Sequence, residues 1–460
     1  MRSVAKIFGP CDPWQETSGH LIVADVAHMH TPPSFSPAVA AAPRQSALRT
    51  ALAGLIGNVL EWFDFAVYGY FATEIGRQFF PRSDPTAQQL LAFAVFALGF
   101  LARPFGSLVL GRVGDRIGRR ALLTLSIAVM GGATLIVGLL PTYQQVGVAA
   151  PILLIAMRVV QGFSLGGEFT GSMVYTTEQA SPMMRGLISS STAAGTTLGF
   201  ILGSGSAWLV NSALTTEQVS TWGWRVPFIA SITLCVVGWF LRRGISETAE
   251  GVKASAIRPP LLPSLLADWR PIVQTFGIVA MTNAAYYLTF TYAVERRKSL
   301  TGEGGEAFLL ANTLSLVVVL ISKPFGGWLS DRVGRRRLMM ALTVIVMGLI
   351  YLALRLMLFG TPRAFISGQI LLAVPIGMAL GLQGAMVVEI FPLRSRVTSM
   401  SFAYSITLAL AGGTAPLVST WLIEKLGHPL APAYYIMLYG ALGLALMWPM
   451  RETNARPLDE

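Results

Sequence analysis

Charged side chains inside apolar stretches are the residues of this chain most able to do chemistry. Glu61, Asp64 and Tyr68 stand at positions i, i+3 and i+7, so they share one face of a helix. A charge near the centre of a bilayer costs about 2.5–3.5 kcal/mol on insertion scales, which makes such a residue a functional candidate by default. Burial and a neighbouring arginine act in opposite directions on a carboxyl pKa, and that balance suits a group that loads and releases a proton.

A second apolar stretch carries Arg158, Gln161 and Glu168 at i, i+3 and i+10, again on one helix face. A third stretch carries Arg103. An arginine holds a carboxylate through two parallel hydrogen bonds. We therefore predict that Arg103 and Arg158 anchor a substrate carboxylate, with Gln161 beside them.

The carboxylates Glu61, Asp64 and Glu168 are the predicted proton-coupling groups. The alternative for each of these charges is a structural ion pair between neighbouring spans. Residue spacing within a helix leaves both interpretations open, because it does not say which helices face each other.

Aromatic residues near these charges offer a further kind of binding. The faces of Trp62, Tyr68, Tyr286 and Tyr287 can attract a quaternary ammonium by cation–π contact, so the three tyrosines join the predicted substrate site. The alternative is that these rings face lipid or lie at the membrane interface, where aromatic residues are common.

One basic string, G-x-x-x-D-R-x-G-R-R, occurs twice. Its copies consist of Gly111, Asp115, Arg116, Gly118, Arg119 and Arg120, and of Gly327, Asp331, Arg332, Gly334, Arg335 and Arg336. The aspartate can accept hydrogen bonds from a helix N-terminus across the molecule or pair with an arginine, and the glycines allow close helix approach. We predict a gating role for both copies. Simple retention of basic loops on one side of a membrane is the alternative.

These strings lie between long apolar segments. The chain has 460 residues, of which 53% are hydrophobic and 12% charged, with a mean hydropathy of +0.59. Soluble domains carry about 25% charged residues. Segments of about 20 apolar residues can each cross a bilayer as a helix. We expect twelve spans, near 49–75, 87–110, 121–141, 148–174, 185–210, 223–243, 271–294, 306–329, 338–359, 365–388, 397–423 and 431–450.

The duplication divides the chain into two homologous halves. We expect a tail over 1–48, a six-helix half over 49–243, a linker over 244–270, a second half over 271–450 and a tail over 451–460. Met1 and Met29 are both candidate starts. A second echo supports the repeat, since Glu178 and Glu389 are each followed seven residues later by an arginine, Arg185 and Arg396. The fold class is therefore an all-α membrane protein with two pseudo-symmetric halves.

The net charge of +11 fits this topology better than nucleic-acid binding, because the basic residues cluster in short loops beside apolar spans. The loops after even-numbered spans are the richest in arginine, so both termini are predicted to be cytoplasmic in a bacterial inner membrane. The string Glu295-Arg-Arg-Lys298 is the exception, because it is basic but follows the seventh span. The expected partners are lipid, protons and a small solute, for a monomer without cofactor or bound metal.

The repeated string resembles the signature of the major facilitator superfamily. Further motifs look like its metabolite:proton symporter family: Gly57-Asn58-x-x-Glu61-Trp62-Phe63-Asp64-Phe65, Arg103-Pro104-Phe105-Gly106, Gln161-Gly162-Phe163-Ser164-x-Gly166-Gly167-Glu168 and Trp222-Gly223-Trp224-Arg225-Val226-Pro227-Phe228. Within it, Thr282-Asn283-x-x-Tyr286-Tyr287 looks most like the proline/betaine transporters. The resemblance implies the twelve-helix fold and proton symport of a small carboxylate-bearing solute such as proline or glycine betaine.

Other classes fit the sequence less well. Uptake of a di- or tricarboxylate, such as alpha-ketoglutarate or citrate, is the nearest alternative and would need two or more cations at the site. An ATP-driven pump would need a phosphate-binding loop, which the sequence does not contain. No nucleophile or metal-ligand constellation stands in the spans, so an enzyme is not expected. A non-transporting receptor on the same scaffold remains a further alternative.

Overall fold

The computed structural model describes residues 47–460 except 82–83, 118, 167, 244–260, 302–304, 394, 455–457 and 459–460; side chains of 47–57, 111–124 and 238–262 are also outside the described part. The predicted tail over 1–48, apart from its last two residues, and most of the predicted linker therefore lie outside the described residues. Residues 45–460 form one compact unit.

The described part of the N-terminal half consists of helices joined by short turns and loops. Its α-helices are α1 (Ala47–Tyr70), α2 (Ala72–Phe79), α3 (Pro85–Ile117), α4 (Arg119–Leu139), α5 (Tyr143–Val146), α6 (Ala149–Ser164), α7 (Glu168–Gln179), α8 (Arg185–Ala213), α9 (Thr216–Thr221) and α10 (Val226–Arg243). Two short 3₁₀ turns, η1 (Pro182–Met184) and η2 (Gly223–Arg225), precede α8 and α10.

The C-terminal half follows the same plan. It contains α12 (Leu261–Ala267), α13 (Trp269–Tyr287), α14 (Ala293–Thr301), α15 (Glu306–Val333), α16 (Arg335–Phe359), α17 (Pro362–Glu389), α18 (Arg396–Thr407), α19 (Ala415–Leu426) and α20 (Ala431–Met447). Two π-helical segments, η4 (Leu288–Tyr292) and η5 (Leu408–Gly413), join α13 to α14 and α18 towards α19. Each of the twelve expected ranges overlaps one of these helices, which confirms the all-α fold class.

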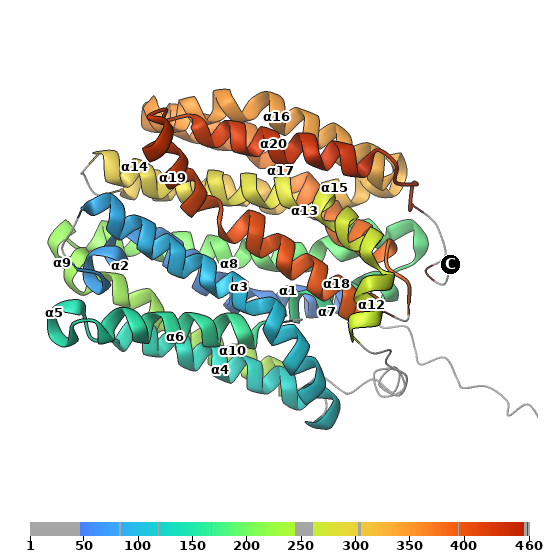
Figure 1. The fold of residues 1–460 in the computed structure, drawn as a ribbon, viewed down its shortest axis with the longest axis horizontal. Helices are drawn as coiled ribbons and strands as arrows, with labels where there is room; N and C mark the ends of the chain where they lie inside the picture. Colours follow the sequence, from blue (N-terminus) through green and yellow to red (C-terminus); the bar gives the residue numbers. More distant parts are fainter. Residues whose placement is uncertain are drawn as a thin grey trace, which may run out of the picture. The chain divides into compact units, whose positions relative to one another are not determined.

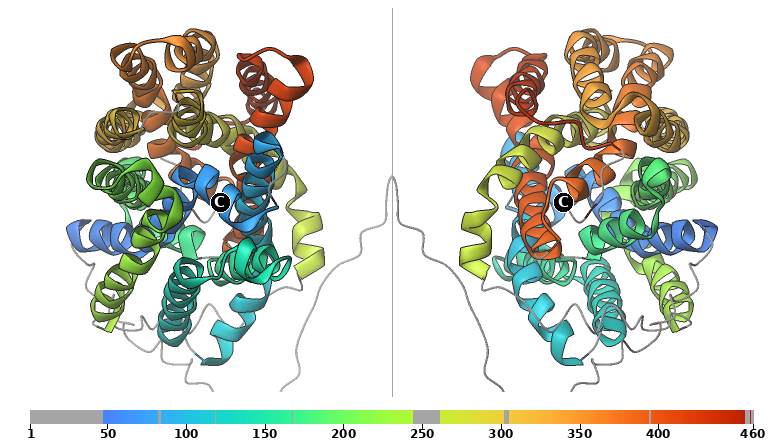
Figure 2. Two further views of the ribbon diagram at one scale, coloured as in Figure 1. Left: turned by 90° about the vertical axis from the view of Figure 1, so that its left-hand side faces the viewer. Right: turned by 90° about the vertical axis from the view of Figure 1, so that its right-hand side faces the viewer.

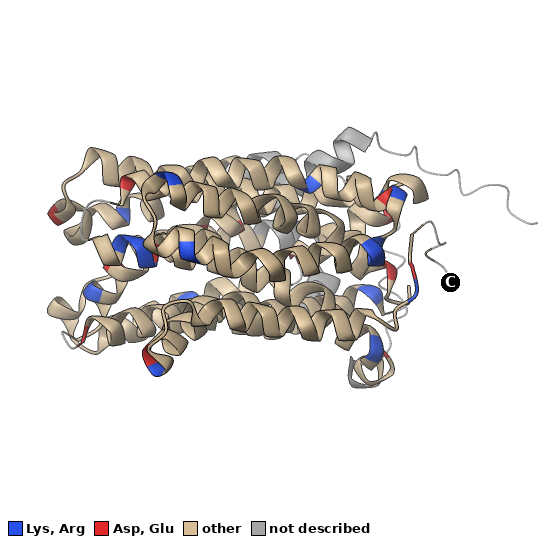
Figure 3. Cartoon of the chain, turned by 90° about the horizontal axis from the view of Figure 1, so that it is seen from above, with Lys and Arg blue, Asp and Glu red and all other residues tan. Residues whose placement is uncertain are grey.

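Seven of the described helical segments are long and apolar enough to cross a membrane by length and composition. They are 85–110, 149–179, 182–213, 306–333, 335–359, 362–389 and 396–426. Shorter apolar helices cover 125–139, 223–237 and 431–447. Charged side chains gather near the two ends of the bundle, and the long middle is mostly uncharged (Figure 3), as the burial of a helix in lipid requires.

The two halves lie side by side with their helices running along one common direction (Figures 1 and 2). They meet mainly where α8 packs against α15 and α17, and where α3 packs against α18. We call the end that holds the α15–α16 turn and the chain's C-terminus the motif end, and the end that holds α2, α9 and α14 the opposite end (Figure 1).

Glycines set the closest helix approaches. A Cβ at Gly199 on α8 would lie 2.6 Å from Val59 O on α1, and one at Gly413 would lie 2.6 Å from the Phe100 side chain on α3. Only a residue without a side chain lets the backbones come this near. Gly199 and Gly203, one turn apart, therefore mark a packing face of α8 against α1.

Candidate functional site

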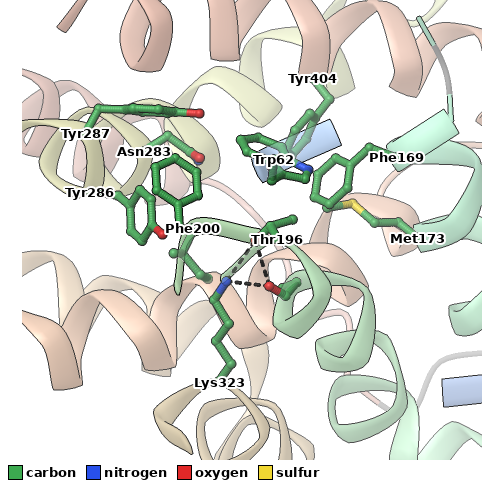
Figure 4. A pocket seen from close by; sticks show the side chains of 12 residues that line it. Trp62, Phe169, Met173, Thr196, Phe200, Asn283, Tyr286, Tyr287, Lys323 and Tyr404 are labelled. Carbon is green, nitrogen blue, oxygen red and sulfur yellow. Dashed lines mark hydrogen bonds between the residues drawn. The ribbon is translucent and has the colours of Figure 1, made fainter. Parts of the chain in front are cut away.

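A small cavity lies between the two halves, near the middle of the bundle. Helices of both halves contribute to its lining (Figure 4), which consists of Trp62, Phe169, Met173, Ala193, Thr196, Phe200, Asn283, Tyr286, Tyr287, Lys323, Leu380 and Tyr404. The lining is largely aromatic. Among the described residues, Lys323 is its one charged side chain, and no carboxylate contributes to it.

Lys323 is 1% exposed and extends from α15 towards α8. Its ammonium donates hydrogen bonds to the Ala193 carbonyl and to Thr196 Oγ1, the latter at 3.0 Å (Figure 4). The Nζ atom lies 6.0 Å from the centre of the Tyr286 ring. Lys323 therefore links the two halves at the cavity wall through a charge that has no carboxylate partner among the described residues.

Several donors around the cavity are unpaired. The hydroxyls of Tyr286 and Tyr287 and the indole N–H of Trp62 are buried and have no hydrogen-bond partner among the described residues. Buried donors are normally paired, so donors that converge on a cavity mark a place for a polar ligand. Tyr404 differs from them, since its hydroxyl accepts a hydrogen bond of 3.3 Å from Gln383 Nε2.

Two predicted charges of the N-terminal half, Asp64 and Arg158, form an ion pair between α1 and α6. Arg158 Nη1 lies 2.6 Å from Asp64 Oδ2, and Gln161 Nε2 donates to Asp64 Oδ1 at 2.8 Å. Thr134 Oγ1 lies 3.0 Å from the same oxygen. The Arg158 guanidinium is 3.8 Å from the centre of the Tyr68 ring. Asp64 and Tyr68 of α1 thus face Arg158 and Gln161 of α6, which within-helix spacing alone does not reveal.

Glu61 forms a second ion pair, with Arg103 of α3. Three aromatic rings surround the Arg103 guanidinium, those of Trp62 and Phe65 at 5.1 Å and that of Phe100 at 5.3 Å. The Trp62 ring that contacts the Arg103 guanidinium also lines the cavity. Arg103 therefore lies next to the cavity without being part of its lining.

The predicted substrate residues divide into two groups. Tyr286 and Tyr287 line the cavity, whereas Arg103, Arg158, Gln161 and Tyr68 do not. Glu168 is half-buried at the start of α7, one residue before the cavity-lining Phe169.

Lys323, Asn283 and Tyr404 line the cavity but are not among the predicted site residues. A lone lysine inside the apolar range 306–329 is the signal that points to Lys323, because an intramembrane charge is a functional candidate.

The second copy of the repeated string links the two halves at the motif end. Asp331 accepts hydrogen bonds from the backbone N–H groups of Gly186 at 2.9 Å and Leu187 at 3.0 Å, at the start of α8 in the other half. A carboxylate at a helix N-terminus satisfies free N–H groups and opposes the positive end of the helix dipole. Arg335 joins this group through Asp331 at 2.7 Å and Glu389 at 3.3 Å.

The glycines and remaining arginines of this copy have separate tasks. A Cβ at Gly327 would lie 2.3 Å from Gly186 O, and Gly334 has φ +105°, a backbone conformation that favours glycine. Arg336 donates to the carbonyls of Met447 and Trp448, which end α20. Arg332 is exposed, with its guanidinium 4.0 Å from the centre of the Trp328 ring.

The first copy is helical over 111–117 and 119–120. Gly118 and the side chains of Asp115, Arg116, Arg119 and Arg120 lie outside the described residues, as does the surrounding of Gly111. The gating role of both copies stays a prediction.

A polar cluster holds the halves together at the opposite end. Lys298 Nζ donates to the Tyr70 carbonyl at 2.8 Å, and it lies 3.1 Å from Glu295 and 3.5 Å from Glu74. Glu295 accepts the backbone N–H of Thr73 at 2.8 Å. These contacts give Glu295 and Lys298 a role in holding the two halves together. That role accounts for a basic string after the seventh span, where the sequence otherwise has few basic residues.

Comparisons with known proteins agree with this architecture. Residues 50–250 match the family model described as sugar (and other) transporter, and residues 304–459 match that of the major facilitator superfamily. The xylose transporter XylE from E. coli, solved in a partially occluded inward-open conformation, has the same fold, with a TM-score of 0.68 over 88% of this chain and 98% of that one at 16% identity.

Curated relatives are more similar in sequence. The proline/betaine transporter of Salmonella typhimurium is 33% identical over 429 residues, 89% of this chain and 85% of that protein. The citrate-proton symporter of Klebsiella pneumoniae is 35% identical over 393 residues, 84% of this chain and 88% of that protein. The ectoine/proline transporter ProP of Corynebacterium glutamicum is 33% identical over 432 residues. With two helical halves around a central cavity, this chain therefore belongs to the major facilitator superfamily, among the metabolite:proton symporters that resemble the proline/betaine transporters.

Proposed function

We propose that this protein takes up a small zwitterionic solute with one carboxylate, such as proline or glycine betaine, together with protons across a bacterial inner membrane. The proposal rests on the similarity to proline, betaine and ectoine transporters and on the chemistry of the cavity. We further propose that both termini lie on the cytoplasmic side. The motif end would then be the cytoplasmic end.

The cavity lining is the observation that carries the choice of solute. A zwitterion needs one cation for its carboxylate and an apolar or aromatic surface for its ammonium. Lys323 supplies the cation, and the rings of Trp62, Tyr286 and Tyr287 supply the aromatic surface. The solute would sit between α8 of one half and α13 and α15 of the other.

Citrate uptake is the second candidate, because a citrate-proton symporter is among the relatives. A tricarboxylate at neutral pH would bring up to three negative charges into a buried site. One lysine among the described lining residues cannot balance them, and unbalanced buried charge is costly. The lining therefore favours the zwitterion.

Proton coupling is assigned to Glu61, Asp64 and Glu168. Asp64 and Glu61 each form an ion pair with a buried arginine, so a proton on either carboxyl would break a pair and change how α1 is held. Arg158, Gln161 and Tyr68 position Asp64 in this scheme, and Arg103 positions Glu61.

Alternating access supplies the transport step. The two halves would rock around the cavity, as internal repeats of this kind permit. The contacts of Asp331 and Arg335 would hold the motif end closed, and those of Lys298 would hold the opposite end closed. Release of one set while the other persists would open the cavity to one side.

Uptake into proteoliposomes tests the proposal. Purified protein would be given radiolabelled proline, glycine betaine, alpha-ketoglutarate and citrate with an imposed inward proton gradient. We expect uptake of a zwitterion that a protonophore abolishes. Uptake of citrate alone would overturn the choice of solute. A folded protein that takes up none of the four would favour the non-transporting receptor, and uptake that needs ATP would exclude symport.

A further inference from the structure

We propose that Lys323 binds the carboxylate of the transported solute, and that in the empty cavity the same ammonium ties α15 to α8 until the solute displaces that tie. The inference rests on the proposed function, because it assumes that the solute carries a carboxylate. It assigns substrate binding to a residue of the C-terminal half instead of the arginines of the N-terminal half.

Ion pairing separates Lys323 from the other buried cations. Six others are described, and each interacts with a carboxylate: Arg103 with Glu61, Arg158 with Asp64, Lys298 with Glu295, Arg335 with Asp331, Arg396 with Glu178, and Arg185, electrostatically, with Glu389. Arg103 and Arg158 are therefore already occupied. Lys323 has no carboxylate partner among the described residues, only one carbonyl and one hydroxyl. A buried ammonium without a counter-ion is the group that gains most from an incoming anion.

Neighbouring donors complete a carboxylate site. The ammonium has three N–H groups, of which Ala193 O and Thr196 Oγ1 take two. The unpaired hydroxyl of Tyr286 and the unpaired indole N–H of Trp62 belong to the same lining. A carboxylate offers about four lone-pair sites, which suits several donors that converge on one place.

The lining also discriminates against cations. A quaternary ammonium alone would meet the aromatic rings favourably but would be repelled by Lys323, since no acidic residue of the described lining offsets that charge. The cavity should therefore accept glycine betaine and reject choline, which carries the same trimethylammonium group with a hydroxymethyl group in place of the carboxylate.

The position of Lys323 connects binding to the closed motif end. On α15, Lys323 precedes Asp331 by eight residues, about 12 Å along the helix. On α8, Ala193 accepts a hydrogen bond from Lys323 and Gly186 donates one to Asp331. These two α8 residues are seven positions apart. The two contacts are thus successive links across one helix pair. A carboxylate that takes the Lys323 ammonium away from Ala193 would leave the contacts of Asp331 with Gly186 and Leu187 to hold α15 at the start of α8.

Uptake kinetics of Lys323→Gln test the inference, with Lys425→Gln as the matched control because Lys425 is exposed on α19. Loss of a charged hydrogen bond is expected to raise the KM for glycine betaine about 10- to 100-fold. Competition by choline should stay equal or strengthen, because the repelling charge is gone. Lys323→Arg should restore part of the affinity, and the control should match the wild type.

A second variant keeps the test informative if Lys323→Gln does not fold. Thr196→Val removes one acceptor of the ammonium and leaves the charge in place. It should lower the KM for glycine betaine about two- to fivefold, since the solute then displaces one hydrogen bond fewer. A purely structural role of Lys323 predicts no tighter binding.

Two results would overturn the inference in different ways. A Lys323→Gln protein with an unchanged KM for glycine betaine refutes the role of Lys323 and leaves the proposed function standing. A folded wild-type protein that takes up neither glycine betaine nor proline refutes the proposed function, and the assignment of Lys323 falls with it.

Discussion

Arg396 forms an ion pair with Glu178 of the other half, with 2.8 Å between Nη1 and Oε1. Each residue belongs to one copy of the duplicated Glu-to-Arg spacing, so the arginine of the second copy pairs with the glutamate of the first. Arg396 also donates to the carbonyls of Phe391 and Leu458. The pair lies at the motif end, where it adds a cross-half contact between α7 and α18 to the one that Asp331 makes with α8.

Neutralising this pair tests how much it contributes. Glu178→Gln and Arg396→Gln should each lower the Tm in detergent, and the double variant should lower it by less than the sum of the two. We expect a coupling of about 0.5–1 kcal/mol, because the Glu178 side chain is 36% exposed and water screens it. Additive shifts would mean that the two charges do not interact in solution.

Gly327 offers a test of the closed motif end. A Cβ there would lie 2.3 Å from Gly186 O, so Gly327→Ala should force α15 and α8 apart. We expect at least about a tenfold loss of uptake, which corresponds to about 1.4 kcal/mol, within the usual cost of overpacking. Gly348→Ala is the control, since nothing lies within 4 Å of a Cβ at that position. Equal uptake by both variants would contradict a need for close approach at Gly327.

The Asp64–Arg158 pair should respond asymmetrically to mutation. Arg158→Met leaves Asp64 buried without its cation, at a cost of about 3–5 kcal/mol. Asp64→Asn combined with Arg158→Met removes both charges and should recover most of the folded yield. The measurement is monodisperse protein by size-exclusion chromatography together with Tm. A double variant as unstable as Arg158→Met would argue that the pair is needed for the fold itself.

Proton coupling by Glu168 makes a prediction of its own. Glu168→Gln cannot exchange a proton at that side chain, so solute uptake should no longer follow an imposed proton gradient, while exchange of labelled for unlabelled solute persists. Proton flux measured with a pH-sensitive dye inside the vesicles, together with labelled solute, separates these outcomes. Unchanged solute-driven proton flux would remove Glu168 from the coupling groups and leave Glu61 and Asp64.

The sequence predicts the fold well because hydropathy and a repeated string are local signals. It also predicts that Asp64 and Tyr68, and Arg158 and Gln161, share helix faces, and the structure brings all four together. It does not predict that Asp64 forms an ion pair with Arg158, because the pairing depends on which face of α1 packs against α6. Lys323 stands out in the sequence as one lysine among apolar residues, but its contacts with Ala193 and Thr196 depend in the same way on how α15 is placed against α8.

Backbone irregularities are also hidden in the sequence. The π-helical segments η4 and η5 interrupt α13–α14 and α18–α19. The first begins directly after the cavity-lining Tyr287, where an extra residue per turn changes the direction of the following side chains. Apolar periodicity predicts ordinary helix for these stretches, so the directions of the side chains after Tyr287 need the structure.

The lone charge of the cavity lining has an electrical consequence. In the transport that we propose, Lys323 stays with the protein and the two charges of a zwitterion cancel, so each cycle with one proton carries one net positive charge inward. A membrane potential of 100 mV, negative inside, then adds about 2.3 kcal/mol per cycle. That energy alone sustains about a fiftyfold solute accumulation, so voltage would drive uptake even where the pH is equal on both sides.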